Sequence, residues 1–495
     1  MSQYDAGTRD AHECSAVELA RRLADGSTTS QAVTEALLVR ITAIDGPDTA
    51  VALRSVLAVA PDAMAAAAGA DADRAKGAVR SALHGVPVVI KDNIEAIGLP
   101  GTAGATSLAN RPVREDAPLV RRLRDAGMVV LAATNLSEWA NLRSARSTSG
   151  WSAVGGLTTN PYRLDRSAGG SSSGSGAAVA AGLSPLSVGT ETDGSITCPA
   201  SLNGVVGLKP AVGTIPAAKV VPLSASQDSP GPMARSVADV AALYEVLAAV
   251  GGVQDRVAAG CEGLRVGAAA SLLTGHTRTD ALFAEAIRLL ERAGARVTDV
   301  AYPKASDDVD NDEFKVLLCE MADDLSAYLA SREGSGPRSL AEAIAHEDAH
   351  ADVELAYFGH EFFEQAVATG GRASADYAPA RERNLAWAVE QCLSPALADV
   401  DVVVAPAYGP AWKNDLVLGG HPAAYSGICS APAIAGWPIA TVPMGLVDDL
   451  PVGLALVGRP GTEALLLAVA GGLEHEAGLL DNGALSPRFH GPTRS

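Results

Sequence analysis

The chain has 495 residues, of which 48% are hydrophobic, and it carries a formal net charge of −19 at pH 7. That length fits two or three average domains or one large α/β enzyme, and it is enough to bury a large core. The acidic balance argues against a nucleic-acid partner, because phosphate binding needs clustered lysine and arginine. A basic cluster such as Arg121 to Arg124 follows an amphipathic pattern that is typical of a solvated helix face.

The six cysteines are scattered without CxxC spacing, so neither a zinc ribbon nor a disulfide framework is expected. Residues 1–15 lack the basic region and the apolar stretch of a secretory signal. No apolar run reaches the length that a membrane-spanning helix needs. We therefore expect a reduced, cytoplasmic protein that binds neither membranes nor nucleic acids.

Hydrophobic periodicity predicts alternating helices and strands along the first half of the chain. A helix is expected at residues 15–23, because Ser15 and Glu18 have the spacing of a capping box. Residues 30–44 place apolar side chains on one helical face, which predicts a second helix. Further helices are expected at residues 117–126 and 177–182, and strands at residues 85–90, 128–132 and 186–189.

The second half continues this alternation after a proline-rich turn predicted at residues 229–232. Helices are expected at residues 237–247 and 279–293, and strands at residues 264–268, 296–300, 402–405, 440–443 and 453–457. Residues 305–385 begin with an acidic run and then become polar and helical, which indicates a helical elaboration over the core. Without repeats or long linkers, residues 1–495 are predicted to form one α/β domain, with a catalytic core at about 83–250 and 400–460.

Lys91 directly follows the apolar run of residues 85–90 and is the candidate general base. An isolated lysine at the end of a strand usually extends to solvent. Beside a buried strand, however, loss of hydration favours the neutral amine, which can accept a proton.

Two serine sites complete the acyl-transfer chemistry that the sequence indicates. The turn before Ser195 would aim consecutive backbone N–H groups into one concavity, where an oxyanion could bind. Ser171 and Ser172 lie on a glycine-rich loop that runs into an apolar helix, so this loop is expected to be ordered. Plain turns and flexible loops are the alternatives when each motif is taken alone.

Three other motifs match known catalytic or cofactor-binding patterns in part, but each lacks a feature that its pattern requires. Residues 170–174 match GxSxG, but the nucleophile elbow of α/β-hydrolases follows a strand, and none is predicted there. Residues 346–350 match HExxH, but Val353 and Ala356 replace the Gly and His of the metzincin continuation, so chance surface histidines are expected instead of zinc ligands. Residues 174–176 do not begin a dinucleotide fingerprint, because Val179 replaces its third glycine.

Three segments carry a resemblance to a known family: VVIKDN around Lys91, GGSSSG around Ser171 and GTETDGSI around Ser195. They resemble the Lys–Ser–Ser triad motifs of the amidase signature family, and the separation of the serines, 195 − 171 = 24 residues, agrees with it. The resemblance covers about residues 83–460 and is weakest between 305 and 385.

Within this family the chain looks most like the bacterial peptide amidases. The segments that carry this closer likeness are residues 135–141, 149–152, 191–195 and 355–359. Many family members have Asp at the position of Glu191 and Gly at the position of Asp193. These differences fit the peptide-amidase branch and argue against a glutamine amidotransferase.

The resemblance implies a large, mixed, twisted β-sheet that is covered by helices on both faces. It implies that Ser195 is the nucleophile and that Ser171, after a cis peptide bond from Gly170, lies between Ser195 and Lys91. Neutral Lys91 would take a proton from Ser171 while Ser171 takes one from Ser195, and Ser172 would orient this relay. The resemblance also implies an oxyanion hole formed by the backbone N–H groups of Thr192, Asp193, Gly194 and Ser195. The resemblance implies no cofactor, no metal and no obligate partner chain.

The leading hypothesis is a serine amidase that hydrolyses C-terminal amides of peptides or N-acyl amino acids to carboxylate and ammonia through an acyl-enzyme. Aryl, fatty or small aliphatic amides are alternative substrates, and a glutaminase component of an amidotransferase or an inactive scaffold are alternative functions. The pocket walls are expected at residues 141–151 and in the helical region after residue 305. Cys198, in an apolar stretch expected to be a turn, is expected to serve packing alone.

Overall fold

The computed structural model describes residues 11–422 and 424–491, so the N-terminal segment in which no signal was expected lies largely outside it. Its centre is an 11-stranded sheet with the order β1-β3-β2-β6-β8-β7-β12-β13-β11-β9-β10. The strands are β1 (Val56–Val59), β2 (Pro87–Lys91), β3 (Val129–Thr134), β6 (Leu186–Glu191), β7 (Val206–Lys209), β8 (Ser229–Ala234), β9 (Arg265–Ala268), β10 (Arg296–Asp299), β11 (Val402–Pro406), β12 (Ile439–Val447) and β13 (Leu450–Val457). A small hairpin of β4 (Trp151–Ser152) and β5 (Gly156–Leu157) stands apart.

The sheet is mixed, as the resemblance implied. Strand β2 runs parallel to β3 and to β6, and β9 runs parallel to β10 and β11. The strands between them, from β6 through β8, β7, β12 and β13 to β11, pair antiparallel. Because β2 and β6 are parallel neighbours, their carboxyl ends meet at one edge of the sheet. Lys91 and the segment after Glu191 therefore meet there.

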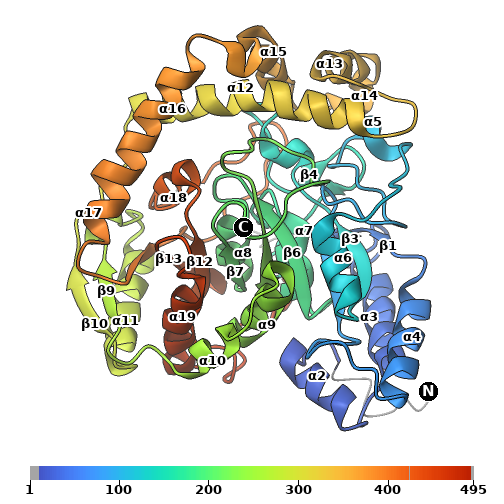
Figure 1. The fold of residues 1–495 in the computed structure, drawn as a ribbon, viewed down its shortest axis with the longest axis vertical. Helices are drawn as coiled ribbons and strands as arrows, with labels where there is room; N and C mark the ends of the chain where they lie inside the picture. Colours follow the sequence, from blue (N-terminus) through green and yellow to red (C-terminus); the bar gives the residue numbers. More distant parts are fainter. Residues whose placement is uncertain (1–10, 423, 492–495) are drawn as a thin grey trace.

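Helices cover both faces of this sheet, which confirms the expected fold class (Figure 1). In the first half they are α2 (Ala16–Ala24), α3 (Ser30–Ile44), α4 (Ala63–Ala75), α5 (Thr106–Ala109), α6 (Pro118–Asp125), η1 (Glu138–Asn141), α7 (Ser173–Ala180), α8 (Thr197–Asn203) and α9 (Val237–Ala248). They continue with α10 (Val253–Ala258), η2 (Ala270–Leu272), α11 (Thr277–Arg292), α17 (Ser394–Ala396), α18 (Ser430–Ala435) and α19 (Glu463–Ala477). Among the described residues, no helix has the length and apolar character to cross a bilayer.

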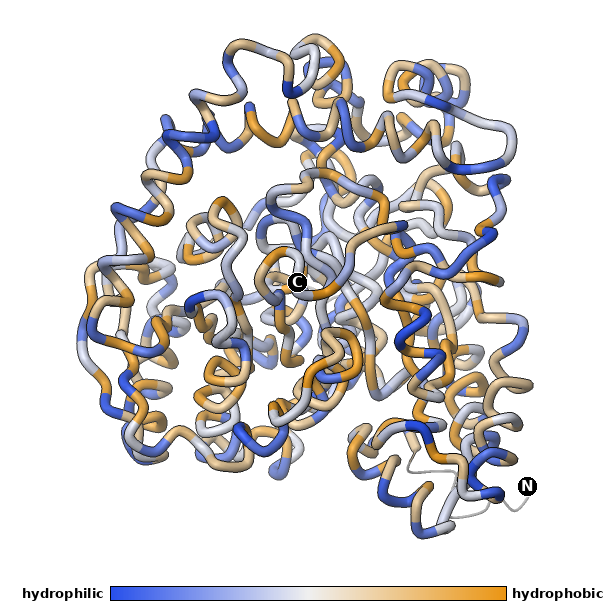
Figure 2. Tube along the Cα trace, in the orientation of Figure 1, coloured by the Kyte–Doolittle hydropathy of each residue, from blue (hydrophilic) through white to orange (hydrophobic). Residues whose placement is uncertain are grey.

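The segment expected to be helical forms an arc over the top of the molecule in Figure 1. It contains α12 (Asp307–Ser331), α13 (Leu340–Ala349), α14 (Ala351–Glu354), α15 (Glu361–Thr369), η3 (Gly371–Ala373) and α16 (Tyr377–Leu385), and the π-helix η4 (Ala386–Leu393) continues it beyond the predicted end at residue 385. Hydrophobic and hydrophilic residues alternate along this arc in Figure 2, as in amphipathic helices that bury one face. The arc is called the helical layer below.

Most predicted elements lie where the periodicity placed them. The helix at residues 30–44 has those bounds, and Ser15 Oγ accepts the Glu18 N–H at 3.1 Å, as a capping box requires. Helix α7 begins at Ser173, four residues before its predicted start at 177 (177 − 173), and residues 197–203 form helix α8 where a turn was expected. Strand β1 and helices α4 and α19 were not predicted.

The proline-rich segment at residues 229–232 is a strand, not the predicted turn. Strand β8 pairs with β6 over its whole length but with β7 only at Met233 and Ala234. The backbone N–H groups of alternate residues in a strand point to the same neighbouring strand. Pro230 and Pro232 have no N–H group, so hydrogen-bond donors are missing on one side of β8 only. The segment can therefore lie inside the sheet although its composition is typical of turns.

Glycines on the strands let helix α8 lie directly on the sheet. A Cβ added at Gly207 would lie 2.8 Å from Ile196 Cγ2 and 2.9 Å from Ala200 Cβ. The space beside Gly231 is smaller still, because an added Cβ would lie 2.0 Å from the Leu208 carbonyl oxygen of the neighbouring strand β7. This close packing fixes the position of the turn before α8, which contains Ser195.

Gly231→Ala should destabilise the protein by on the order of 3 kcal/mol, because the new methyl group would collide with backbone that cannot move independently of the sheet. Gly69→Ala is the matched control: Gly69 is exposed in α4 with no atom within 4 Å of an added Cβ. There alanine should be neutral or stabilise the helix by up to about 1 kcal/mol. Chemical denaturation of both variants measures the difference, and equal unfolding free energies would contradict the packing argument.

Candidate active site

Lys91 is the last residue of β2, and its side chain is completely buried. Its Nζ lies 2.8 Å from Ser171 Oγ, 2.8 Å from Thr190 Oγ1 and 3.2 Å from the Thr190 carbonyl oxygen. Burial lowers the pKa of Lys91 to about 7, although the carboxylates of Asp228 and Glu191 act in the opposite direction. The amine is therefore neutral in a large fraction of molecules near neutral pH.

Thr190 determines how this amine is oriented. A neutral amine has two N–H groups and one lone pair, and the two oxygens of Thr190 can accept both N–H groups. The remaining contact, with the hydroxyl of Ser171, then faces the lone pair. Thr190 Oγ1 also accepts a hydrogen bond from Asn93 Nδ2 at 3.0 Å, which holds the threonine in place.

Sequence reasoning did not identify Thr190 or Asn93. Both lie close to predicted strand ends, at 90 and 189, but threonine and asparagine are common at such positions. The useful signal is the parallel pairing of β2 with β6, which brings the residues after both strands together. That pairing is a tertiary contact, and no motif in the sequence encodes it.

The loop before α7 carries Ser171 and Ser172. The Gly170–Ser171 peptide bond is cis, as expected. The Ser171 carbonyl oxygen accepts the N–H of Ser137 at 3.1 Å, and the Ser172 N–H donates to the carbonyl oxygen of Ser195 at 3.1 Å. The Ser172 hydroxyl donates to the Thr190 carbonyl oxygen at 2.9 Å, so it supports the threonine beside Lys91.

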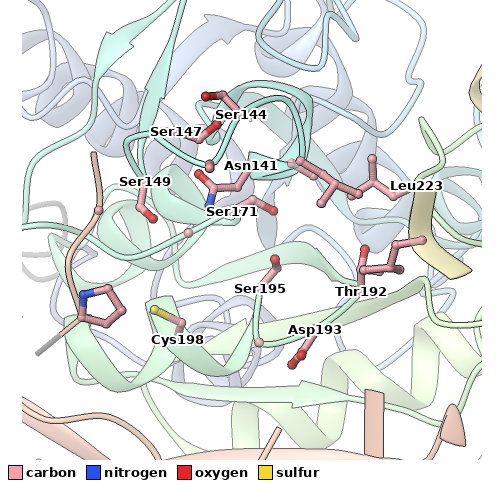
Figure 3. Close-up of a pocket in the computed structure, with 18 of the residues that line it drawn as sticks. Asn141, Ser144, Ser147, Ser149, Ser171, Thr192, Asp193, Ser195, Cys198 and Leu223 are labelled. Atoms are coloured by element: carbon pink, nitrogen blue, oxygen red, sulfur yellow. The ribbon is translucent and has the colours of Figure 1, made fainter. Parts of the chain in front are cut away.

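Ser195 lies in the turn between β6 and α8, and its hydroxyl points toward Ser171 in Figure 3. Gly194 adopts a φ of +75°, which glycine tolerates better than other residues. Buried Glu191 fixes the far side of the turn, because its carboxylate accepts the N–H groups of Ile196 at 2.6 Å and Thr197 at 2.7 Å. Within the described residues, the N–H groups of Thr192, Asp193, Gly194 and Ser195 have no hydrogen-bond acceptor.

Ser171 and Ser195 open into one cavity of about 380 Å³. The wall predicted in residues 141–151 contributes Asn141, Leu142, Ser144, Ala145, Ser147 and Ser149, most of which are labelled in Figure 3. The helical layer contributes Leu317 of α12, again as expected. The sequence analysis did not predict Leu223, Tyr408, Trp412, Gly420 or Pro422, which come from loops distant in sequence.

Arg143 anchors this wall to the helical layer. Its buried guanidinium pairs with the Glu138 carboxylate and donates to the Glu354 carbonyl oxygen at 2.8 Å. The same group lies 4.5 Å from the ring centroid of Phe358, in a cation–π contact. Phe358 belongs to the segment 355–359 that carried the closer family likeness, and this contact gives that segment a structural role.

The two histidine rings of the HExxH segment, His346 and His350, stack face to face with their centroids 4.1 Å apart. Helix α13 ends at Ala349, before His350. His346 Nε2 lies 3.1 Å from Thr106 Oγ1, and His350 Nδ1 lies 2.8 Å from the His346 carbonyl oxygen. Buried Glu347 instead accepts a hydrogen bond from Trp139 Nε1 at 3.0 Å. The GxSxG segment likewise leads into α7 with no strand directly before it in the described chain.

In the described part of the chain, Glu138, Glu347 and Glu354 are the one group of side chains with metal-ligand spacing. Burial raises the pKa of Glu138 well above its usual range, which favours its neutral form. Arg143 lies within 3.8 Å of all three carboxylates, and His360 Nδ1 lies 2.9 Å from Glu347. The chain's own cations thus balance the charge of this cluster.

Cys198 lies on the first turn of α8 and lines the cavity, although only 5% of its surface is exposed. Burial raises the pKa of its thiol to about 12, so the thiol stays protonated at neutral pH. A protonated, buried thiol is a poor nucleophile. A packing role for Cys198 remains our prediction.

Comparison with known proteins agrees with this geometry. A model of the amidase family matches residues 32–467. The solved structure of the peptide amidase PAM in complex with the competitive inhibitor chymostatin is 42% identical, with a TM-score of 0.88 over 93% of this chain and 97% of that chain. Native peptide amidase from Stenotrophomonas maltophilia is 42% identical, with a TM-score of 0.85 over 93% of this chain and 96% of that chain.

Two relatives known by sequence show the range of functions in the family. A probable amidase of Arabidopsis thaliana is 39% identical in an alignment of 337 positions that covers 64% of this chain and 66% of that protein. One component of the glutamyl-tRNA(Gln) amidotransferase of Symbiobacterium thermophilum is 33% identical in an alignment of 480 positions that covers 92% of this chain and 95% of that protein. The family match and these similarities show that the chain belongs to the amidase signature family and is an amide-hydrolysing enzyme.

Proposed function

We propose that this enzyme hydrolyses C-terminal carboxamides of peptides or N-acyl amino acids, releasing ammonia and a carboxylate. The observation that carries the proposal is the buried contact between Lys91 Nζ and Ser171 Oγ, behind a cavity that Ser171 and Ser195 both line. The similarity to solved peptide amidases supports the choice of substrate. The reaction as proposed calls on no metal, cofactor or partner chain.

In the first half of the proposed reaction, neutral Lys91 takes a proton from Ser171 while Ser171 takes one from Ser195. Ser195 Oγ then forms a bond with the carbonyl carbon of the amide. The backbone N–H groups of residues 192–195 stabilise the oxyanion that develops on the carbonyl oxygen. Because these donors lack other acceptors, they are free to bind that oxygen without losing an existing hydrogen bond.

In the second half, the C–N bond breaks and the relay returns its proton to the departing ammonia. The acyl group is left as an ester on Ser195. Water then attacks the acyl carbon of this ester and gives a proton through Ser171 to Lys91. The bond between the acyl carbon and Ser195 Oγ breaks, the relay returns the proton to Ser195 Oγ, and the acid leaves as a carboxylate. Lys91 thus acts in turn as base and acid, and a pKa near neutrality suits both roles.

A glutaminase function is less well supported. Glutamine presents its side-chain amide together with an α-carboxylate, which binds most strongly to a cationic partner such as Arg or Lys. Among the described residues that line the cavity, none is Lys, Arg or His, and Asp193 adds a negative charge when it is ionised. An N-acylated peptide amide has no carboxylate beside its scissile bond, so it avoids this repulsion.

The wild-type enzyme should release ammonia from an N-acetylated dipeptide amide, and Ser195→Ala should reduce kcat by roughly a thousandfold or more, because the acyl-enzyme cannot form. A coupled ammonia assay measures both, with L-glutamine tested in parallel. Ammonia from glutamine but not from the peptide amide would favour the glutaminase. Aryl, fatty and aliphatic amides should be tested if neither compound reacts.

The rate should also depend on pH in a defined direction. Burial lowers the pKa of Lys91 to about 7, so the amine is neutral above that pH and protonated below it. The value of kcat/KM should therefore rise with pH through about 7 and fall about tenfold per unit in more acidic solution. A pH–rate profile that stays flat from neutral to strongly acidic pH would exclude Lys91 as the base.

Thr190→Val should lower kcat by roughly tenfold or more, because it removes one oxygen that orients the Lys91 amine while keeping the branched shape. It should also move the acidic limb of the pH profile to lower pH, since the charged amine loses an acceptor. Thr190→Ser, which keeps the hydroxyl, is the control and should restore both properties. Wild-type kcat and pH dependence in the valine variant would contradict this role.

A further inference from the structure

Asp193 is a carboxylate that the protein itself does not use. Its side chain is exposed although the residue lies in the turn just before Ser195, and it lines the same cavity. No hydrogen-bond donor and no cation of the described chain pairs with this carboxylate. A charged group that has no partner in the protein is available to a ligand.

The other charged groups near Asp193 are occupied elsewhere. The Glu191 carboxylate accepts backbone N–H groups of the turn, and Lys209 Nζ donates to the Trp437 carbonyl oxygen at 2.7 Å. On the facing helix α12, Glu313 accepts a hydrogen bond from Gln227 Nε2 at 2.8 Å. None of these side chains lines the cavity, so Asp193 is its one charged lining residue among those described.

The electrostatic surroundings add to the negative potential of the cavity. Desolvation by the surrounding protein raises the pKa of Asp193, and the charges of Glu191 and Asp310 raise it further, while the ammonium group of Lys209 acts in the opposite direction. Burial raises the pKa of Glu313 on α12 well above its usual range, which favours the neutral form of that side chain. A cation entering the cavity would relieve this repulsion, whereas an anion would increase it.

We propose that Asp193 determines substrate specificity by binding a cationic group close to the scissile amide and by disfavouring substrates that are anionic there. The inference rests on the proposed function and names its substrate class: amidated peptides whose last residue carries an ammonium or guanidinium group. Such a residue would place its charge near Asp193 while its carboxamide lies at Ser195. Side chains without charge remain substrates but gain nothing from this contact.

The same charge affects the product. Hydrolysis converts a neutral carboxamide into a carboxylate beside Ser195, two residues from Asp193. Repulsion between the two carboxylates would weaken product binding, while the neutral substrate is unaffected. Asp193 would therefore reduce product inhibition for every peptide amide, whatever its side chain.

The test compares N-acetyl-lysine amide, N-acetyl-norleucine amide and N-acetyl-glutamic acid α-amide by ammonia release at about pH 8.5. At that pH a lysine side chain, with a pKa of about 10.4, keeps its charge and the glutamate side chain of the substrate is ionised. Asp193 is also ionised, because burial and neighbouring carboxylates raise its pKa only to about 7. The wild-type enzyme should show kcat/KM values that fall by roughly tenfold from lysine to norleucine and roughly tenfold again to glutamate. Added salt should compress these ratios.

Asp193→Asn should bring the three kcat/KM values to within about twofold of one another, because it keeps the shape and removes the charge. Asp48→Asn is the matched control, since Asp48 is exposed and does not line the cavity; it should keep the wild-type ratios. Inhibition by the product N-acetyl-norleucine should be several-fold stronger for Asp193→Asn than for wild type. Ratios between substrates, instead of absolute rates, make the result independent of any effect on the turn.

Equal hydrolysis of the three amides by wild type would overturn the inference and leave the proposed function intact. Unchanged ratios in Asp193→Asn would also overturn it, because another group would then have to recognise the charge. If wild type releases no ammonia from any of the three, the proposed function itself fails and the inference falls with it. The wild-type comparison needs no variant, so poor folding of Asp193→Asn would not prevent a decision.

Discussion

The burial of one amine, Lys91, is the constraint on which the active site depends. A lysine with no access to water favours its neutral form, and only that form can accept a proton at neutral pH. The protein supplies the polar contacts that the buried amine needs through Ser171 and both oxygens of Thr190. These contacts can use its two N–H groups and direct its lone pair, so the burial and the orientation of the proposed base have a common origin.

The sheet brings the other catalytic candidates to this amine. Parallel pairing of β2 with β6 places Lys91 beside Thr190, and the turn that follows β6 carries Ser195. Glycine positions on the strands allow α8 to pack directly on the sheet, which fixes the far end of that turn. The Ser172 N–H then links the two serine loops by donating to the Ser195 carbonyl oxygen. Close packing, not a long network of charges, holds the serines in place.

Different contacts hold the outer wall of the cavity, which is distant from the reacting atoms. Its wall is anchored by a buried arginine, Arg143, that joins the loop after β3 to the helical layer. Loops from the C-terminal third add Tyr408 and Trp412. Variation in these segments can change which acyl groups fit while the proposed relay between Lys91 and Ser195 stays the same. This separation explains how relatives with peptide amidase and amidotransferase names can share one fold.

The amino-acid sequence by itself determined the elements with strong local signals. Apolar runs gave strands such as β2, periodic patterns gave helices such as α3, and the glycine and serine motifs indicated the candidate residues Lys91, Ser171 and Ser195. The local pattern predicted a turn at residues 229–232, but these residues form a strand. A proline-rich segment can lie in a sheet only where the neighbouring strand does not need the missing N–H groups, and the tertiary structure decides this. Only the tertiary structure decided the partners of Lys91, the role of Arg143, the outer lining of the cavity and the unpaired state of Asp193. Each of these depends on groups far apart in sequence, so no local pattern contains the information that brings them together.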